Sequence, residues 1–208
     1  GGVDSFALSN GSYVVISPYW DVGTAVDVGA VTWGSGTTGV SGVITPAKSL
    51  VGTSLNDRVG SWGVAELTNG NYVVCSEVWD NGTILDAGAV TWASGTAGIS
   101  GEISPANSLV GSTAGDNVGY LCAAALSNGN YVVTSPYWDN EAVINVGAVT
   151  WGDGATGISG TISPANSLVG NVAGDQVGSR GAASLTNGSY VLHSDYFDHA
   201  GIPDAGAV

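Results

Sequence analysis

The chain has 208 residues, of which 34 are Gly and none is Met, and its net charge is −14. The 3 basic residues, Lys48, Arg58 and Arg180, are too few to neutralise phosphates, so the composition excludes nucleic acid as a partner. The hydrophobic content of 44% supports a buried core. No apolar run reaches the roughly 18 residues of a membrane helix, so we expect no membrane insertion.

The same short motifs return every 59 residues along the chain. Asn-Gly begins at Asn10, Asn69, Asn128 and Asn187, and Gly-Ala-Val begins at Gly29, Gly88, Gly147 and Gly206. We therefore expect a single repeat domain over 1–208, made of repeats 1–59, 60–118 and 119–177 and a partial repeat 178–208. We call these repeats 1 to 4. We interpret the domain as a segment of a larger propeller or assembly.

One repeat predicts four strands in chain order. In repeat 2, residues 63–67 and 72–75 flank Asn69-Gly70, a hairpin signal for which we expect a type I′ turn. Residues 89–92 form a third strand, and a weaker fourth strand lies near 99–103, before the loop 104–107. No helical period appears anywhere.

The second strand of each repeat is apolar on both faces, as in Tyr13-Val14-Val15-Ile16. A strand buried on both faces indicates a sheet that is covered on both sides. Four-stranded antiparallel units that cover one another are typical of propeller blades, so we predict an all-β propeller with about three and a half repeats present. A β-solenoid or stacked-sheet array is the alternative. We expect the Trp residues within the third strands to lie in the core, namely Trp33, Trp92 and Trp151.

The repeat resembles the FG-GAP repeat of integrin-α-type β-propellers. The segments that carry the resemblance are Gly115-Asp116-Asn117-Val118-Gly119, Val133-Thr134-Ser135-Pro136 and Gly147-Ala148-Val149. The closer similarity is to tandem repeats of bacterial surface, adhesin-like proteins, a repeat type with no assigned activity. The resemblance implies ligand binding on the face that holds the loops between the second and third strands.

FG-GAP blades often carry a calcium loop between the first and second strands. The corresponding segment here, Leu8-Ser9-Asn10-Gly11-Ser12, has no carboxylate, whereas calcium takes several anionic oxygens. We therefore expect no metal and no cofactor. The ends of the chain repeat the same half-unit and do not complement each other, so we also expect no ring closure by this chain alone.

Aromatic-Asp pairs recur in the loop after the second strand. A ring beside a carboxylate suits a sugar site, whereas the structural alternative is that the rings fill gaps between repeats and the Asp residues cap turns. The ligand-binding candidates are Trp20, Asp21, Trp79, Asp80, Trp138, Asp139, Phe197 and Asp198. Further carboxylates of the same rim include Asp57, Asp116 and Asp175.

Residues for catalysis are sparse, and we predict no catalytic residues. His193 and His199, in the last repeat, share a face with Asp195 if the strand extends that far, an arrangement that would seat a metal. No pair of carboxylates stands out as a glycosidase pair, because each has copies in other repeats. Cys75 and Cys122 fall at nearly opposed positions of adjacent repeats, but sheets stack about 10 Å apart, so we predict two free, buried thiols.

These observations favour a non-catalytic structural or adhesive module of a secreted or cell-surface protein. Its expected partners are a protein or glycan on the acidic loop face, together with further repeats or copies of itself. The alternative is a lectin-like, carbohydrate-binding propeller that uses the Trp-Asp loops, and an enzyme comes third.

Overall fold

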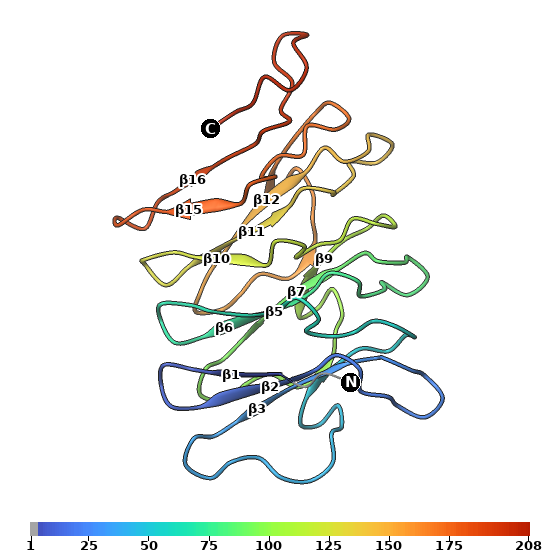
Figure 1. Ribbon diagram of the computed structural model, residues 1–208, viewed down its shortest axis with the longest axis vertical. Helices are drawn as coiled ribbons and strands as arrows, with labels where there is room; N and C mark the ends of the chain where they lie inside the picture. The colour runs from blue at the N-terminus through green and yellow to red at the C-terminus, as the bar shows by residue number, and fades with distance from the viewer. Residues whose placement is uncertain (1–3) are drawn as a thin grey trace.

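The computed structural model describes residues 4–208, which form 16 strands and no helix (Figure 1). Repeat 1 contains β1 (Asp4–Ala7), β2 (Tyr13–Ser17), β3 (Ala30–Gly34) and β4 (Leu50–Val51). Repeat 2 contains β5 (Gly63–Glu66), β6 (Tyr72–Ser76), β7 (Ala89–Ala93), β8 (Gly101–Glu102) and β9 (Ser108–Val110). Repeat 3 contains β10 (Ala123–Ala125), β11 (Tyr131–Ser135), β12 (Ala148–Gly152), β13 (Gly160–Thr161) and β14 (Ser167–Val169). Repeat 4 contains β15 (Ala182–Ser184) and β16 (Tyr190–Leu192).

The predicted all-β repeat architecture is therefore confirmed. Residues 1–3, which the sequence assigns to repeat 1, lie outside the described part. Within residues 4–208 no helix is present that is long and apolar enough to cross a membrane.

Each Asn-Gly turn closes a hairpin, but only its glycine adopts the left-handed conformation. Gly11 has φ 86° and Gly70 has φ 84°, whereas the preceding Asn residues are not in this region. The N–H of Gly11 donates to the carbonyl of Leu8 (3.0 Å), and the N–H of Leu8 donates to the carbonyl of Ser12 (2.9 Å). This geometry is a type I turn followed by a glycine bulge, so the predicted type I′ turn is wrong while the hairpin is confirmed.

The first three strands of a repeat pair antiparallel in chain order, and a fourth strand completes the sheet, as in the order β10-β11-β12-β14. A strand forms within the predicted range 99–103, namely β8. It is not the fourth strand of its own sheet, because that strand follows the loop 104–107, so the predicted place of the strand is wrong. The short strand β8 pairs instead in parallel with β4 of the preceding repeat, with Gly101 opposite Leu50. Likewise, β13 pairs in parallel with β9. We call β8 and β13 crossover strands, because each adds a strand to the sheet of the repeat before it.

The sheets stack face to face along the long axis of the molecule (Figure 1), and the hydrophobic core lies between them. In β6, Tyr72 and Val74 pack on repeat 1, whereas Val73 and Cys75 pack on repeat 3. Side chains alternate between the two faces of a strand, so a strand that is apolar throughout joins two cores. We call the face toward the preceding repeat the rear face and the face toward the next repeat the forward face.

The stack is open. Figure 1 shows the hairpins β1–β2, β5–β6, β10–β11 and β15–β16 one above another as successive layers, and residues 4–208 do not close into a ring. A closed propeller is therefore absent from the described residues. The stacked-sheet array, which the sequence left as the alternative to a propeller, describes the arrangement of these repeats.

The tryptophans of the third strands lie at the edges of the cores, and the prediction that they are core residues is wrong. Trp33 and Trp92 are half-buried, and Trp151 is 44% exposed. The indole N–H of Trp33 donates to the carbonyl of Gly95 in repeat 2, and that of Trp92 donates to Gly154 in repeat 3 (both 3.0 Å). These rings reach the loop of the following repeat, so they link neighbouring layers.

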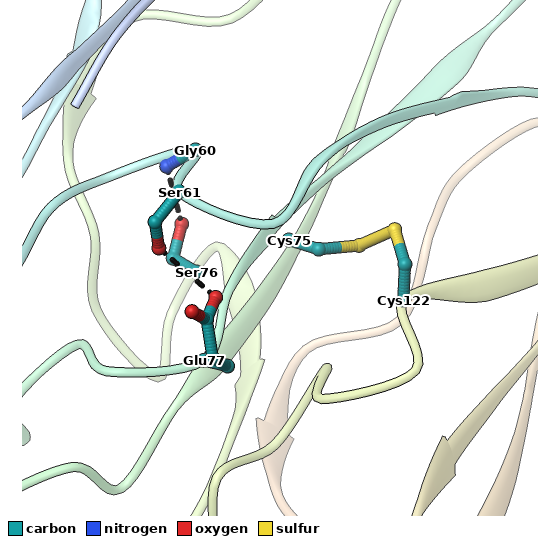
Figure 2. Close-up of a disulfide and its surroundings, with 6 residues drawn as sticks. All are labelled: Gly60, Ser61, Cys75, Ser76, Glu77 and Cys122. Carbon is teal, nitrogen blue, oxygen red and sulfur yellow. Dashed lines mark hydrogen bonds between the residues drawn. A yellow bond between two sulfur atoms is a disulfide. The ribbon is translucent and has the colours of Figure 1, made fainter. Parts of the chain in front are cut away.

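Cys75 and Cys122 form a disulfide between repeats 2 and 3 (Figure 2), with their Cα atoms 5.3 Å apart. The prediction of two free thiols is therefore wrong. It assumed the roughly 10 Å spacing of sheets that are separated by large side chains. The first strands approach more closely, because they carry Gly and Ala at the contact, as at Gly63 in β5 and in the all-Ala strand β10.

The backbone conformation at Cys122, one partner of this disulfide, is left-handed. Cys122 has φ 55°, whereas the equivalent positions of repeats 2 and 4 hold Gly63 (φ 94°) and Gly181 (φ 79°). A non-glycine residue is uncommon in this conformation. Repeat 3 therefore places a cysteine where its neighbours need a glycine, and the disulfide holds that cysteine in place.

Candidate functional site

The aromatic-Asp loops lie between neighbouring repeats, on the side of the molecule opposite the Asn-Gly turns (Figure 1). The Trp79 side chain is 3% exposed and the Trp138 side chain 2% exposed, each within the core that joins its repeat to the preceding one. Phe197 packs on the core between repeats 3 and 4. Trp20 is half-buried, because none of the described residues packs as a layer on the rear face of repeat 1.

The carboxylate of each aromatic-Asp pair closes its own loop. The Oδ1 atom of Asp80 accepts a hydrogen bond from the backbone N–H of Asp86, six residues later, at 2.8 Å. The same bond recurs in the other repeats, from Asp27 to Asp21, from Asn145 to Asp139 and from Asp204 to Asp198, at 2.8, 2.6 and 2.9 Å. These candidates thus cap loops, and their rings fill the space between layers.

A second set of aspartates joins one repeat to the next. Asp57 is fully buried, and its Oδ2 atom accepts the backbone N–H groups of Thr53 and Ser54, both at 2.7 Å. Its Oδ1 atom accepts the N–H of Asp80 in repeat 2 at 3.0 Å. Asp116 and Asp175 repeat this pattern toward Asp139 and Asp198, at 2.9 and 3.0 Å. We call Asp57, Asp116 and Asp175 the clasp aspartates.

Burial has the largest effect on the pKa of two of the clasp aspartates. Burial raises the pKa of Asp57 and Asp116 above the ordinary value of 3.8, and their three backbone N–H donors act in the opposite direction. A buried carboxylate with all its donors inside the protein has few lone pairs left for a ligand. The repeated carboxylates are therefore used within the fold.

No group of three or more His, Cys, Asp and Glu side chains in residues 4–208 is arranged to hold a metal ion. Strand β16 ends at Leu192, so the shared strand face proposed for His193, Asp195 and His199 does not form. Asp195 instead forms an ion pair with Arg180, and His199 lies in an exposed turn that bridges to Ile202.

The sequence analysis missed a row of partly exposed aromatic side chains on the loop side of the stack. Trp62 stacks on Tyr120 with ring centroids 5.3 Å apart, and Tyr120 meets Tyr137 edge to face at 4.9 Å. The neighbouring Tyr120, burial and, to a smaller extent, Tyr196 raise the pKa of Tyr137. We call these four residues the aromatic row.

Part of the aromatic row was readable in the sequence. Tyr137 and Tyr196 stand 59 residues apart, and Tyr19 holds the same position in repeat 1, where it lies under the Arg58 guanidinium, 5.6 Å from the ring centroid. Trp62 and Tyr120 have no such copies. A search for repeated positions therefore finds Tyr19, Tyr137 and Tyr196, but it misses Trp62 and Tyr120, which stack between repeats 2 and 3.

Comparison with known protein families identifies a tandem repeat. A family model described as a repeat of unknown function (DUF5650) matches residues 7–61, 66–120, 125–179 and 184–208, and the chain belongs to this family. The matches start 59 residues apart, which confirms the period, and no FG-GAP match supports the predicted resemblance. A search of curated proteins found no match.

Proposed function

We propose that this chain is a non-catalytic structural module of a secreted or cell-surface protein, whose repeats build an extended stack for adhesion or assembly. The observation that carries the proposal is the use of the repeated carboxylates: each clasp aspartate joins its own loop to the next repeat. A catalytic or ligand-binding carboxylate needs free lone pairs and access to solvent. The clasp aspartates have few free lone pairs and no access to solvent, so their repetition serves the architecture.

The disulfide between Cys75 and Cys122 supports the proposed location. Disulfides persist in oxidising compartments and are rare in reducing cytosol. With a net charge of −14, the module also stays soluble at high local concentration, which suits an extracellular repeat protein.

A propeller of FG-GAP type remains a finer proposal for longer arrays of this repeat. A sheet such as β10-β11-β12-β14 has the four antiparallel strands of a propeller blade. Ring closure would need further repeats and a steady rotation from one sheet to the next.

The proposed function is tested by looking for ligands and turnover on the intact chain. We expect no saturable binding on a glycan array and no hydrolysis of chromogenic glycosides. We also expect Asp116→Asn to lower the melting temperature without changing either readout. Turnover that is abolished by a single substitution would overturn the proposal.

Carbohydrate binding is the second candidate, and the aromatic row favours it. Trp62 and Tyr196 are each about half exposed, at 48% and 47%, and sugar rings stack on aromatic faces. Among the aromatic rings of the Trp-Asp loop candidates, only Trp20 and Phe197 are partly exposed, so stacking of a sugar in those loops is proposed for these two rings alone. Glycan binding that is lost in Trp62→Ala and retained in the control Tyr19→Ala would establish this alternative.

A further inference from the structure

The side chain of Arg58 lies between an aromatic ring and a carboxylate of repeat 1. Its guanidinium lies over the Tyr19 ring, 5.6 Å from the ring centroid. Its Nη2 atom is 3.7 Å from the Oδ2 atom of Asp27. The Arg58 side chain is 42% exposed, so the ring and the carboxylate together hold a cation at the surface of the molecule.

Arg180 in repeat 4 lies in a similar setting. It forms an ion pair with Asp195, whose next residue in the chain is Tyr196. The hydrogen bond to Asp195 and the charge of Asp195, and to a smaller extent Tyr196, raise the pKa of Arg180. Both arginines of this chain therefore have a carboxylate and a tyrosine as neighbours.

Repeat 2 keeps the carboxylate of this arrangement but has no arginine beside it. Glu77 and Trp62 stand two periods before Asp195 and Arg180, so a tryptophan takes the place of the arginine. Glu77 is half-buried, and its Oε2 atom accepts the hydroxyl of Ser61 at 2.9 Å (Figure 2). In the described part of the chain, no hydrogen bond reaches its Oε1 atom, and no Lys or Arg side chain forms an ion pair with it. The charge of Glu77 is therefore not neutralised within repeats 1 to 4.

The aromatic row begins beside this carboxylate. Trp62 directly follows Ser61, the residue that donates to Glu77. On the other side, the backbone N–H of Tyr120 donates to the carbonyl of Asn117 (2.9 Å), and the Asn117 amide donates to the carbonyl of Glu77 (3.1 Å). Tyr120 covers one face of the Trp62 ring, which is still 48% exposed. The middle of the stack thus presents exposed aromatic surface next to an unpaired negative charge.

We propose that Glu77 and the aromatic row form a docking surface for arginine side chains in a basic segment of a partner protein. This partner extends the proposed adhesion or assembly function, on which the inference rests. A guanidinium is planar, so it stacks on an aromatic face while its N–H groups pair with a carboxylate. Arg58 and Arg180 show that this fold already holds a guanidinium in this way.

The charge of the whole chain favours a basic partner. The net charge is −14, and the chain has only three basic residues, so its field attracts cationic segments and repels acidic ones. The aromatic row extends from Trp62 in repeat 2 to Tyr196 in repeat 4, so an extended segment with several arginines meets more than one ring. Contacts made by one segment at successive repeats strengthen one another, because the later contacts are intramolecular.

The test is isothermal titration calorimetry of the full chain with a synthetic peptide that has three arginines separated by glycines. Two matched peptides carry lysine or the uncharged isostere citrulline in place of arginine. We expect saturable binding of the arginine peptide, severalfold weaker binding of the lysine peptide and no binding of the citrulline peptide. Because salt screens the charges, the affinity for the arginine peptide should fall as the salt concentration rises.

Variants of the chain locate the binding surface. Trp62→Ala removes the exposed ring, and Glu77→Gln removes the charge while keeping an acceptor for Ser61, so each should weaken binding of the arginine peptide at least fivefold. Trp151→Ala removes a tryptophan that is 44% exposed outside the row, and Asp153→Asn removes one negative charge from another turn. Both control variants should bind like wild type. Melting curves of all four variants verify that they fold.

Three results would overturn the inference. The first is the absence of binding to the arginine peptide, and the second is binding that the control variants weaken as much as Trp62→Ala and Glu77→Gln do, which is attraction by net charge alone. The third is glycan binding that depends on Trp62 in a chain that does not bind the arginine peptide. A chain that binds no peptide still stands as a structural module, whereas turnover overturns the proposed function, so the two failures are distinguishable.

Discussion

The Oδ1 atom of Asp57 accepts the backbone N–H of Asp80, 23 residues later in the chain and one repeat further along the stack, at 3.0 Å. Two more hydrogen bonds tie the same carboxylate to its own loop. One buried side chain therefore fixes the loop of one repeat and the start of a loop in the next. Stability of the loop side should depend strongly on each clasp aspartate.

Replacing a clasp aspartate by asparagine should destabilise the stack. In Asp116→Asn the new NH₂ group faces backbone N–H donors, so at least one donor loses its acceptor. We expect the free energy of unfolding to fall by about 2–3 kcal/mol, as measured by urea denaturation. Asp153→Asn is the matched control, because Asp153 accepts hydrogen bonds only from its own turn, from Ala155 and Thr156. An equal loss in both variants would contradict the role of the clasp.

Stability should decrease as the pH rises toward neutrality. Burial raises the pKa of Asp57 and Asp116 in the folded state above the unfolded value, so folding favours their protonated forms. Their contribution is therefore fully present below the unfolded pKa and is lost as the pH rises through the folded pKa. We expect the urea midpoint to be higher near pH 4 than near pH 7, helped by the smaller net charge in acid. A profile for Asp116→Asn as steep as that of wild type would argue against this origin.

Removing the disulfide should weaken the interface between repeats 2 and 3, even when both cysteines are replaced by residues that the next interface uses at the same positions. The double variant Cys75→Thr, Cys122→Gly installs the residue pair of the next interface, Thr134 and Gly181. The bond closes a sequence separation of 47 residues, so we expect a loss of roughly 4 kcal/mol in the free energy of unfolding. Thiol titration of wild type in denaturant without reductant should find no free thiol, and two free thiols would contradict the bond.

The inter-repeat bond of the Asn-Gly turn can be isolated by comparing two repeats. Asn69 caps its own turn and also donates to Gly154 in the next repeat, whereas the described residues show only the capping bond for Asn187. Asn69→Ala should therefore cost about 1 kcal/mol more than Asn187→Ala in urea denaturation. Equal losses would show that the contact between repeats contributes nothing measurable.

Calcium should not stabilise the chain. The turn 8–12 carries no carboxylate, and the clasp aspartates already accept backbone N–H groups. We expect melting temperatures with calcium and with a chelator to agree within error. A rise of several degrees in the melting temperature with calcium would contradict this prediction and would indicate a calcium-binding site.

The sequence was most informative about what lies within one repeat. Asn-Gly signals and the doubly apolar second strand predicted the hairpins and the two buried faces of each sheet, which Val73 and Val74 illustrate. A fixed period identifies equivalent residues, but it does not determine the rotation between neighbouring sheets. That rotation depends on packing summed over a whole interface, so a ring and an open stack share the same repeat signature.

The errors at the candidate site have related causes. The spacing of stacked sheets was assumed to be uniform, whereas small residues such as Gly63 and Ala123 let the first strands approach and bring Cys75 to Cys122. Residues of the aromatic row that occur once, such as Trp62, leave no periodic signal. The glycine-to-cysteine exchange at position 122 was visible, but its meaning depends on knowing that the backbone there is left-handed.

The bond between Cys75 and Cys122 also sets how far the chain lengthens when its ends are pulled apart. The cysteines are 47 residues apart in sequence, and the chain between them bears no tension while the bond is intact. A fully extended residue spans at most about 3.6 Å, so an oxidised chain withholds ~170 Å of its contour length. Force then passes from repeat 2 to repeat 3 through two sulfur atoms, and extension draws only on the residues before position 75 and after position 122.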